Sequence, residues 1–244
     1  MTLNRRTFLL GCGLTALAMG IKPQGANALK GNGLNENGIA RSCRPDDPLA
    51  ALMQGNARFA TAWSRQSEAP DAAGSAEAMA SLWLDNCFLP SDVLRQEQAP
   101  WATLLTCADS RVSPAWIFDA APADLFVIRS AGNTAFDEAI ASIEYSVGVL
   151  ECPLVMVMGH SSCGAVQAAR QSESLSPMLE KLLLPIRASI TPGEALQASI
   201  EANARSAARH LIDGSPIIAK AVTDNKLTIV SSYFDIATGT VTLA

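Results

Sequence analysis

The chain has 244 residues and a formal net charge of −5; 49% of its residues are hydrophobic and 17% are charged. This composition fits one globular domain with a sizeable core and excludes an intrinsically disordered chain. No excess or stripe of Lys and Arg of the kind that follows a phosphate backbone is visible, so we expect no nucleic-acid partner.

Residues 1–28 have the pattern of an export signal. Paired arginines in Asn4-Arg-Arg-Thr-Phe-Leu9 precede an uncharged stretch at 8–21, and Ala26-Asn-Ala28 is an A-x-A cleavage site, which together resemble a twin-arginine signal. The stretch is shorter than the roughly 20 residues that span a bilayer, and almost no apolar segment precedes the alternative lipoprotein box at Leu9-Leu-Gly-Cys12. We therefore predict an exported protein, periplasmic or otherwise extracytoplasmic in a bacterium, without a stable membrane anchor after cleavage.

The next part of the chain contains the first predicted helices. Residues 29–45 are rich in Gly, Asn, Ser and Arg and indicate a linker, so we place the folded domain at 46–244. Asp46-Asp-Pro48 is typical of a helix start, and apolar residues follow it at helical spacing. Small and acidic residues at 64–76 indicate a loop before another short helix near 77–84.

The hydrophobic pattern changes from residue 101 onward, where short apolar runs alternate with helical patterns. The runs that we expect to be strands lie at 102–106, 125–128, 154–158 and 227–230. The clearest helix spans 136–150, and 177–223 is predicted to be largely helical with breaks at Pro185 and Pro192-Gly193. Strands that alternate with helices predict an α/β fold with a central, mainly parallel β-sheet flanked by α-helices. Such sheets bind ligands beyond the carboxyl ends of their strands.

Two cysteines and a histidine follow two of these strands. Cys107 directly follows the first apolar run, and His160 and Cys163 follow the third. Each residue alone is more typical of a small buried hydrophobe or of a local hydrogen bond. Together, at one edge of a sheet, two sulfurs and one imidazole are ligands for Zn²⁺ that leave a fourth coordination position open, as in catalytic zinc sites.

A carboxylate and a guanidinium lie close to the first ligand. Asp109 and Arg111 could be a turn former and a surface charge, but they follow Cys107 where the strand ends. There Asp109 can accept a hydrogen bond from zinc-bound water while Arg111 holds it ionised. Asp109 can instead take the fourth coordination position in a closed state, and the sequence permits both states.

Three further cysteines lie between residue 28 and the carboxyl terminus. Cys43 and Cys87 can form a disulfide, or they can be buried free thiols together with Cys152. The sequence does not decide between these alternatives.

These motifs occur in an order and spacing that resemble a β-class carbonic anhydrase. The resemblance spans roughly residues 50–232 and rests mainly on Cys107-Ala-Asp-Ser-Arg111 and Gly159-His-Ser-Ser-Cys-Gly164, with Arg129-Ser-Ala-Gly-Asn133 between them. It implies one Zn²⁺ per chain and Asp109 with Arg111 as the catalytic dyad. The implied reaction is the reversible hydration of CO2 to bicarbonate and a proton by zinc-bound hydroxide that the dyad orients.

The same resemblance implies substrate-binding residues and an oligomer. Gln98 matches a glutamine that hydrogen-bonds the substrate, and Phe126 and Tyr145 match aromatic residues of the CO2 pocket. In that family the pocket lies at a dimer interface, so a homodimer or homotetramer is expected and a partner chain can supply some of these residues. Members that bicarbonate inhibits at a separate site carry Trp where this chain has Leu104, so Arg129 alone does not indicate such inhibition.

Three other functions fit parts of the sequence. Relatives with the same ligands hydrolyse carbonyl sulfide or carbon disulfide, and a permanently capped zinc would make a non-catalytic zinc-binding module. Gly159-His-Ser161-Ser-Cys163 begins like the G-x-S-x-G motif of serine hydrolases but has Cys at the fifth position, and the base would have to be His210.

Overall fold

The computed structural model describes residues 39–173 and 175–244. The predicted twin-arginine segment at 1–28 lies outside the described residues. None of the helices in the described part combines the length and the hydrophobicity of a membrane span.

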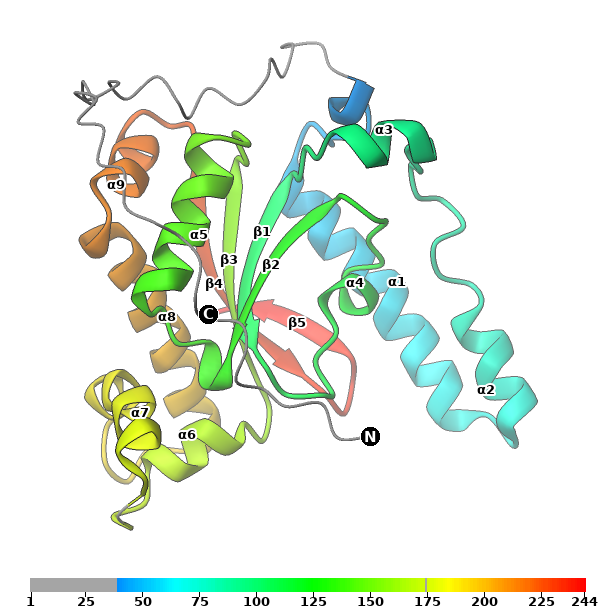
Figure 1. Ribbon diagram of the computed structural model, residues 1–244. Helices are drawn as coiled ribbons and strands as arrows, with labels where there is room; N and C mark the ends of the chain where they lie inside the picture. The colour runs from blue at the N-terminus through cyan, green and yellow to red at the C-terminus, as the bar shows by residue number, and fades with distance from the viewer. Residues whose placement is uncertain (1–38, 174) are drawn as a thin grey trace, which may run out of the picture. The chain divides into compact units, whose positions relative to one another are not determined.

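A five-stranded sheet with the strand order β2-β1-β3-β4-β5 forms the centre of the fold (Figure 1). The strands are β1 (Ala102–Cys107), β2 (Leu125–Ser130), β3 (Leu154–His160), β4 (Thr228–Asp235) and β5 (Thr240–Leu243). The first four pair in parallel, and β5 pairs antiparallel with β4. The predicted α/β class and mainly parallel sheet are confirmed. The additional strand β5 has only four residues, too few for its alternation to stand out from a turn.

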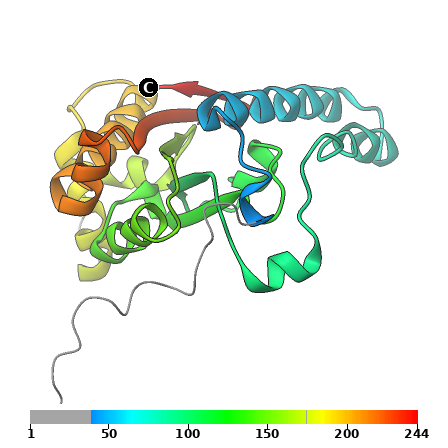
Figure 2. The same ribbon diagram turned by 90° about the horizontal axis from the view of Figure 1, so that it is seen from above.

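Helices cover both faces of the sheet, and β3 shows how its side chains divide between them. Leu154, Met156 and Met158 pack into a core under α1 (Pro48–Glu68) and α4 (Pro114–Ile117). Val155 and Val157 point the other way, into a core under α5 (Asp137–Gly148), α8 (Leu196–Gly214) and α9 (Pro216–Thr223). Because successive strand residues face opposite sides, a strand buried on both faces is a continuous apolar run. Figure 2 shows α1 and α5 on opposite sides of the sheet.

The remaining helices are short or peripheral. They are η1 (Ile39–Arg41), α2 (Ala72–Met79), α3 (Ser91–Gln96), η2 (Ala131–Asn133), α6 (Gly164–Ala169) and α7 (Pro177–Ser189). Residues 39–45, inside the predicted linker, lie against the domain, because Arg44 donates hydrogen bonds to the carbonyls of Ala99, Leu150 and Glu151.

Two local predictions are wrong. The helix expected near 77–84 is α2, which begins earlier because the Asp71 side chain caps it by accepting from the backbone N–H of Gly74. The break expected at Pro185 is absent, and α7 continues through this residue. Leu183 and Ile186, on either side of Pro185, are fully buried, so packing offsets the lost backbone hydrogen bond. The break expected at Pro192-Gly193 is confirmed, and it separates α7 from α8.

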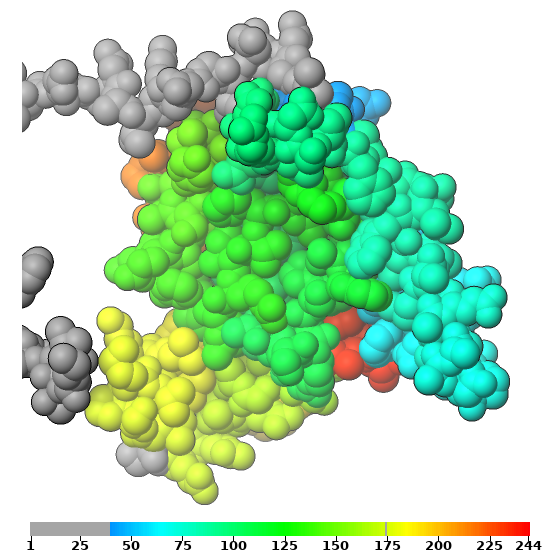
Figure 3. Space-filling model, turned by 45° about the vertical axis from the view of Figure 1, so that its right-hand side comes forward, coloured from blue at the N-terminus to red at the C-terminus, as the bar shows by residue number. Residues whose placement is uncertain are grey.

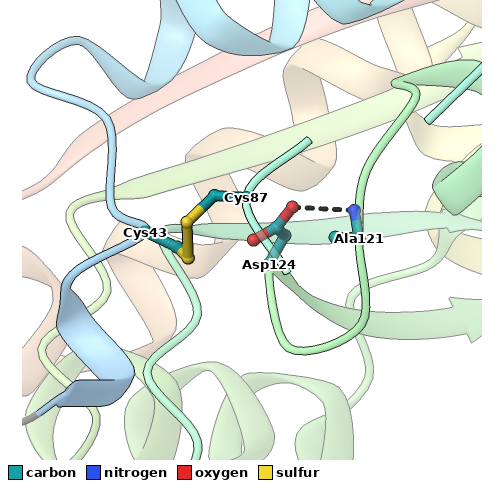
Figure 4. The surroundings of a disulfide bond; sticks show 4 residues. All are labelled: Cys43, Cys87, Ala121 and Asp124. Atoms are coloured by element: carbon teal, nitrogen blue, oxygen red, sulfur yellow. Dashed lines mark hydrogen bonds between the residues drawn. A yellow bond between two sulfur atoms is a disulfide. The ribbon is translucent and has the colours of Figure 1, made fainter. Parts of the chain in front are cut away.

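Cys43 and Cys87 form a disulfide (Figure 4). The bond joins the segment that precedes α1 to the segment that follows α2. Two residues shortly before Cys87 donate hydrogen bonds to Asp119, which follows α4. The backbone N–H of Trp83 donates to the Asp119 carboxylate at 2.7 Å, and the Asn86 amide donates to the Asp119 carbonyl at 2.8 Å. The third cysteine, Cys152, is a buried thiol, and burial raises its pKa.

Candidate metal centre

Two neighbouring parallel strands bring the three predicted ligands together. Cys107 is the last residue of β1, His160 is the last residue of β3, and Cys163 lies directly before α6. Because β1 and β3 are paired in parallel, their carboxyl ends lie at the same edge of the sheet. The two Sγ atoms are 4.0 Å apart, and all three ligand atoms lie within 4.8 Å of one another.

The donor atoms fit a zinc ion. All three side chains are buried, and His160 Nδ1 is 3.0 Å from the Ser161 carbonyl oxygen. A proton on Nδ1 that is donated to this carbonyl leaves Nε2 with a free lone pair. Among the described residues, Nε2 is buried without a hydrogen-bond partner, which a metal ligand explains. Two thiolates and one imidazole are ligands that Zn²⁺ prefers.

The thiol pair has strongly separated pKa values without a metal. The hydrogen bond from Cys163 is the main cause that lowers the pKa of Cys107 to about 4, and contacts with His160 and the Gly132 N–H act in the same direction. The hydrogen bond to Cys107 and burial both raise the pKa of Cys163. The contact between the two sulfurs therefore favours one thiolate beside one thiol, and a divalent cation would stabilise both as thiolates.

Asp109 and Arg111 form a two-point ion pair beside the ligands. Arg111 Nε donates to Asp109 Oδ1 at 2.9 Å and Nη2 donates to Oδ2 at 2.7 Å, while the Arg111 backbone N–H also donates to Oδ1 at 2.9 Å. These hydrogen bonds lower the pKa of Asp109 well below its usual range. Asp109 Oδ2 lies 3.9 Å from His160 Nε2, so the carboxylate is next to the three ligand atoms while Arg111 occupies both of its oxygens.

Arg129 holds the loop that carries this ion pair. Its Nε donates to the carbonyl of Cys107 at 3.1 Å, and its Nη2 donates to the carbonyls of Asp109 and Val112 at 2.7 and 2.8 Å. Arg129 lies in a motif of the sequence, but this contact could not be predicted from it, because carbonyl partners leave no pattern in a sequence.

Gln98, Phe126 and Tyr145 do not lie near the three ligands within one chain. Phe126 pairs in register with Thr103, four residues before Cys107 on the neighbouring strand, which corresponds to about 13 Å along the sheet. The Tyr145 ring lies 6.3 Å from the Phe126 ring. Gln98 is exposed and precedes β1, at the end of that strand opposite Cys107.

The serine-hydrolase alternative finds no support in the geometry. His210 lies on α8 and lines a cavity of about 250 Å³ together with Asp213 and Asn203, and Ser161 does not line it. The Ser161 hydroxyl oxygen accepts a hydrogen bond from the backbone N–H of Ile236.

Known proteins resemble this chain in sequence. A family model described as carbonic anhydrase matches residues 102–241, more than half of the chain. Carbonic anhydrase 2 of Mycobacterium tuberculosis is 51% identical over 72 residues, which cover 30% of this chain and 35% of that protein. A carbonic anhydrase of Pseudomonas aeruginosa is 32% identical over 162 residues, which cover 60% of this chain and 74% of that protein.

Solved structures give the same result. A structure of tetrameric β-carbonic anhydrases from Sordaria macrospora superimposes with a TM-score of 0.58 at 25% identity, covering 63% of this chain and 84% of that chain. A Coccomyxa β-carbonic anhydrase in complex with acetazolamide gives 0.55 at 27% identity, with coverages of 61% and 73%. The chain belongs to the carbonic anhydrase family and has the fold of its β class. The match to the mycobacterial relative covers only 35% of that protein's length.

The effect of Arg111 on the pKa of Asp109 can be tested by mutation. Replacing Arg111 by Gln should raise the pKa of Asp109 toward an ordinary value of about 3.9, because Arg111 is the first cause of the lowered pKa. An Asp with a lowered folded-state pKa stabilises the fold above its unfolded pKa and loses this contribution as the pH falls through the folded value. A carboxyl-carbon NMR titration measures the shift.

The matched control is Arg205→Gln, which removes an arginine that pairs with Glu201 on α8. It should leave the titration of Asp109 unchanged. An Asp109 that titrates identically in wild type and Arg111→Gln would contradict the assigned cause.

Proposed function

We propose that this protein catalyses the reversible hydration of CO2 to bicarbonate and a proton. The observation that carries the proposal is the convergence of Cys107, His160 and Cys163 next to a carboxylate that an arginine keeps ionised. Three protein ligands leave one coordination position of a tetrahedral zinc for solvent, as catalytic sites require.

Each residue has a distinct task in the proposed reaction. When bound, the zinc ion supplies a Lewis acid that makes a water molecule nucleophilic at moderate pH. Asp109, ionised and held at both oxygens by Arg111, accepts a hydrogen bond from the reacting solvent molecule and fixes its orientation. Arg111 prevents protonation of Asp109 and holds the carboxylate in place. The released proton passes to the solvent.

The other zinc-based functions need either a different role for Asp109 or a different substrate. A non-catalytic module requires Asp109 to become the fourth ligand, and for this the carboxylate must give up at least part of its pairing with Arg111. Hydrolysis of carbonyl sulfide or carbon disulfide uses the same ligands, so it differs in the substrate that reaches them. We favour CO2 because the relatives whose names give an activity are carbonic anhydrases.

We propose that a second copy of the chain completes the site. Phe126 and Tyr145 lie together but remote from the ligands of their own chain. Phe126 lies on β2, which is an edge strand of the sheet formed by the described residues, and Tyr145 lies on the neighbouring α5. On this face Val127 of β2 is 41% exposed and Tyr145 of α5 is 42% exposed. Figure 3 shows this face, with β2 and α5 in green at its centre. Pairing two copies at this face would place the aromatic residues and Gln98 of one chain near the metal of the other. The tetrameric Sordaria relatives support such an assembly.

We also propose export to an oxidising compartment. The arginine pair at residues 5–6 and the A-x-A sequence at 26–28 support it, as does the disulfide between Cys43 and Cys87, since disulfides persist mainly outside the cytoplasm. A twin-arginine route carries folded chains, so zinc can bind Cys107 and Cys163 before these thiols meet an oxidant.

The catalytic proposal predicts the behaviour of Asp109→Asn. The variant should keep one zinc per chain but lose roughly 100-fold or more of the CO2 hydration rate, because it removes an orienting carboxylate and no ligand. Stopped-flow hydration and elemental zinc analysis on the same sample measure both quantities. Asp224→Asn, which removes a surface carboxylate paired with Lys220, is the matched control and should keep full activity.

Two results would refute the proposal. Undiminished hydration in zinc-loaded Asp109→Asn would remove Asp109 from the mechanism. Wild-type protein with one zinc that turns over carbonyl sulfide or carbon disulfide but not CO2 would replace the substrate.

The assembly proposal predicts the effect of Val127→Arg. An exposed cation on the open edge of β2 should lower the association state in sedimentation velocity and abolish most hydration, although zinc remains bound. The control is Leu243→Arg, which changes an exposed apolar side chain on the opposite edge strand β5 and should retain turnover. A monomeric Val127→Arg with wild-type activity would show that one chain suffices.

The export proposal predicts the fate of a chain with Arg5→Lys and Arg6→Lys. It should remain in the cytoplasm with its amino-terminal segment uncleaved, and alkylation should find Cys43 and Cys87 reduced. The wild-type chain should be cleaved and carry the disulfide. Equal cleavage and oxidation of both chains would exclude the twin-arginine route.

A further inference from the structure

We propose that Asn203 is a positioning residue for the metal ligand Cys107, acting through the backbone of Gly132. The inference rests on the proposed metal site, and no sequence motif pointed to this residue. Asn203 lies on α8, is 3% exposed, and is 71 residues from Gly132 in the chain.

Two hydrogen bonds in series connect Asn203 to the ligand. The Asn203 amide donates from Nδ2 to the carbonyl oxygen of Gly132 at 2.8 Å. The backbone N–H of Gly132 donates to Cys107 Sγ at 3.3 Å. Gly132 is therefore fixed at its carbonyl by α8 and uses its amide to hold the sulfur.

Gly132 needs such support because of its backbone conformation. It has a φ of +70° in the turn η2, a region that glycine enters freely but does not favour strongly over others. A larger residue would be strained at this φ, and its Cβ would lie 2.6 Å from Ile186 Cδ1 and 3.0 Å from Ala165 Cβ, so the neighbours would have to shift. A hydrogen bond from a buried amide removes the freedom that the missing side chain leaves.

The same face of α8 also supports the second ligand strand. Ile200, one helical turn before Asn203, packs against Gly159, where a Cβ would lie 2.6 Å from Ile200 Cγ2. Gly159 directly precedes His160. One face of α8 thus contacts the backbone near two of the three ligands. On this face, Asn203 reaches Gly132, whose N–H is hydrogen-bonded to the ligand Cys107.

A hydrogen bond to a metal-bound thiolate has an electronic effect that simple packing lacks. The N–H withdraws electron density from the sulfur and fixes its lone-pair direction, and such outer contacts typically change metal affinity by roughly 10-fold to 100-fold. Loss of Asn203 should therefore change the metal–sulfur bond as well as the stability of the fold.

The chain provides a matched control in Asn56. This residue is also a buried asparagine on a helix, 4% exposed, and its Nδ2 donates to the carbonyl of Gly239 at 2.9 Å. Gly239 has a φ of +73°, nearly the same as Gly132. Asn56 also donates to Ile117 and accepts from Val241, so its loss should destabilise the fold at least as much. In the described part of the chain, none of these three partners is hydrogen-bonded to a predicted ligand.

The experiment compares Asn203→Leu with Asn56→Leu after loading with Co²⁺. We expect the thiolate-to-cobalt charge-transfer absorption of Asn203→Leu to shift from that of the wild type, and chelator competition to show a metal affinity lower by roughly 10-fold or more. Asn56→Leu should lose thermal stability but keep the wild-type spectrum. If leucine at either position prevents folding, the Asn→Ala pair serves the same comparison.

The outcomes separate the two proposals. A wild-type chain without a thiolate–cobalt absorption would refute the metal site and this inference with it. A normal wild-type spectrum that Asn203→Leu reproduces, or that Asn56→Leu alters equally, would refute only the positioning role of Asn203.

Discussion

The rest of the site depends on one constraint: two sulfurs and one imidazole nitrogen must meet within a few ångströms at a buried point. Adjacent parallel strands meet this constraint, because Cys107 and His160 end β1 and β3 at the same edge of the sheet. The turn after β3 then returns the chain to place Cys163 beside them. Burying the unpaired Nε2 of His160 beside two cysteine sulfurs is unfavourable without a cation, so the fold holds an arrangement that a metal completes.

Charge balance explains why the dyad lies where it does. Two thiolates neutralise a divalent ion, which leaves Asp109 to be balanced by Arg111. Arg129 then holds the intervening loop through three carbonyls without adding a second partner for the carboxylate. Arg111 thus keeps Asp109 ionised, and Arg129 keeps the loop that holds Asp109 next to His160.

The sequence predicts the strands and the ligands because both are local signals. Apolar runs mark buried strands, and Cys107, His160 and Cys163 follow them directly. The features that the sequence misjudged or left open depend on tertiary packing. The break expected at Pro185 is absent because the neighbours of this residue are buried, and the open question of Cys43 and Cys87 is decided only where the fold brings them together. Asn203 belongs to the same class, since its partner is a backbone carbonyl that carries no residue identity.

The distribution of residues along the sheet explains why a single chain is an incomplete catalyst in our proposal. The ligands occupy the carboxyl end of β1, whereas Phe126 pairs near its amino end and Gln98 precedes it. A rigid parallel sheet cannot fold back to join its two ends. A second copy can join them, provided that its open β2 edge approaches in the opposite direction. Metal binding and substrate binding then depend on different contacts, so the loss of assembly should abolish turnover while zinc stays bound.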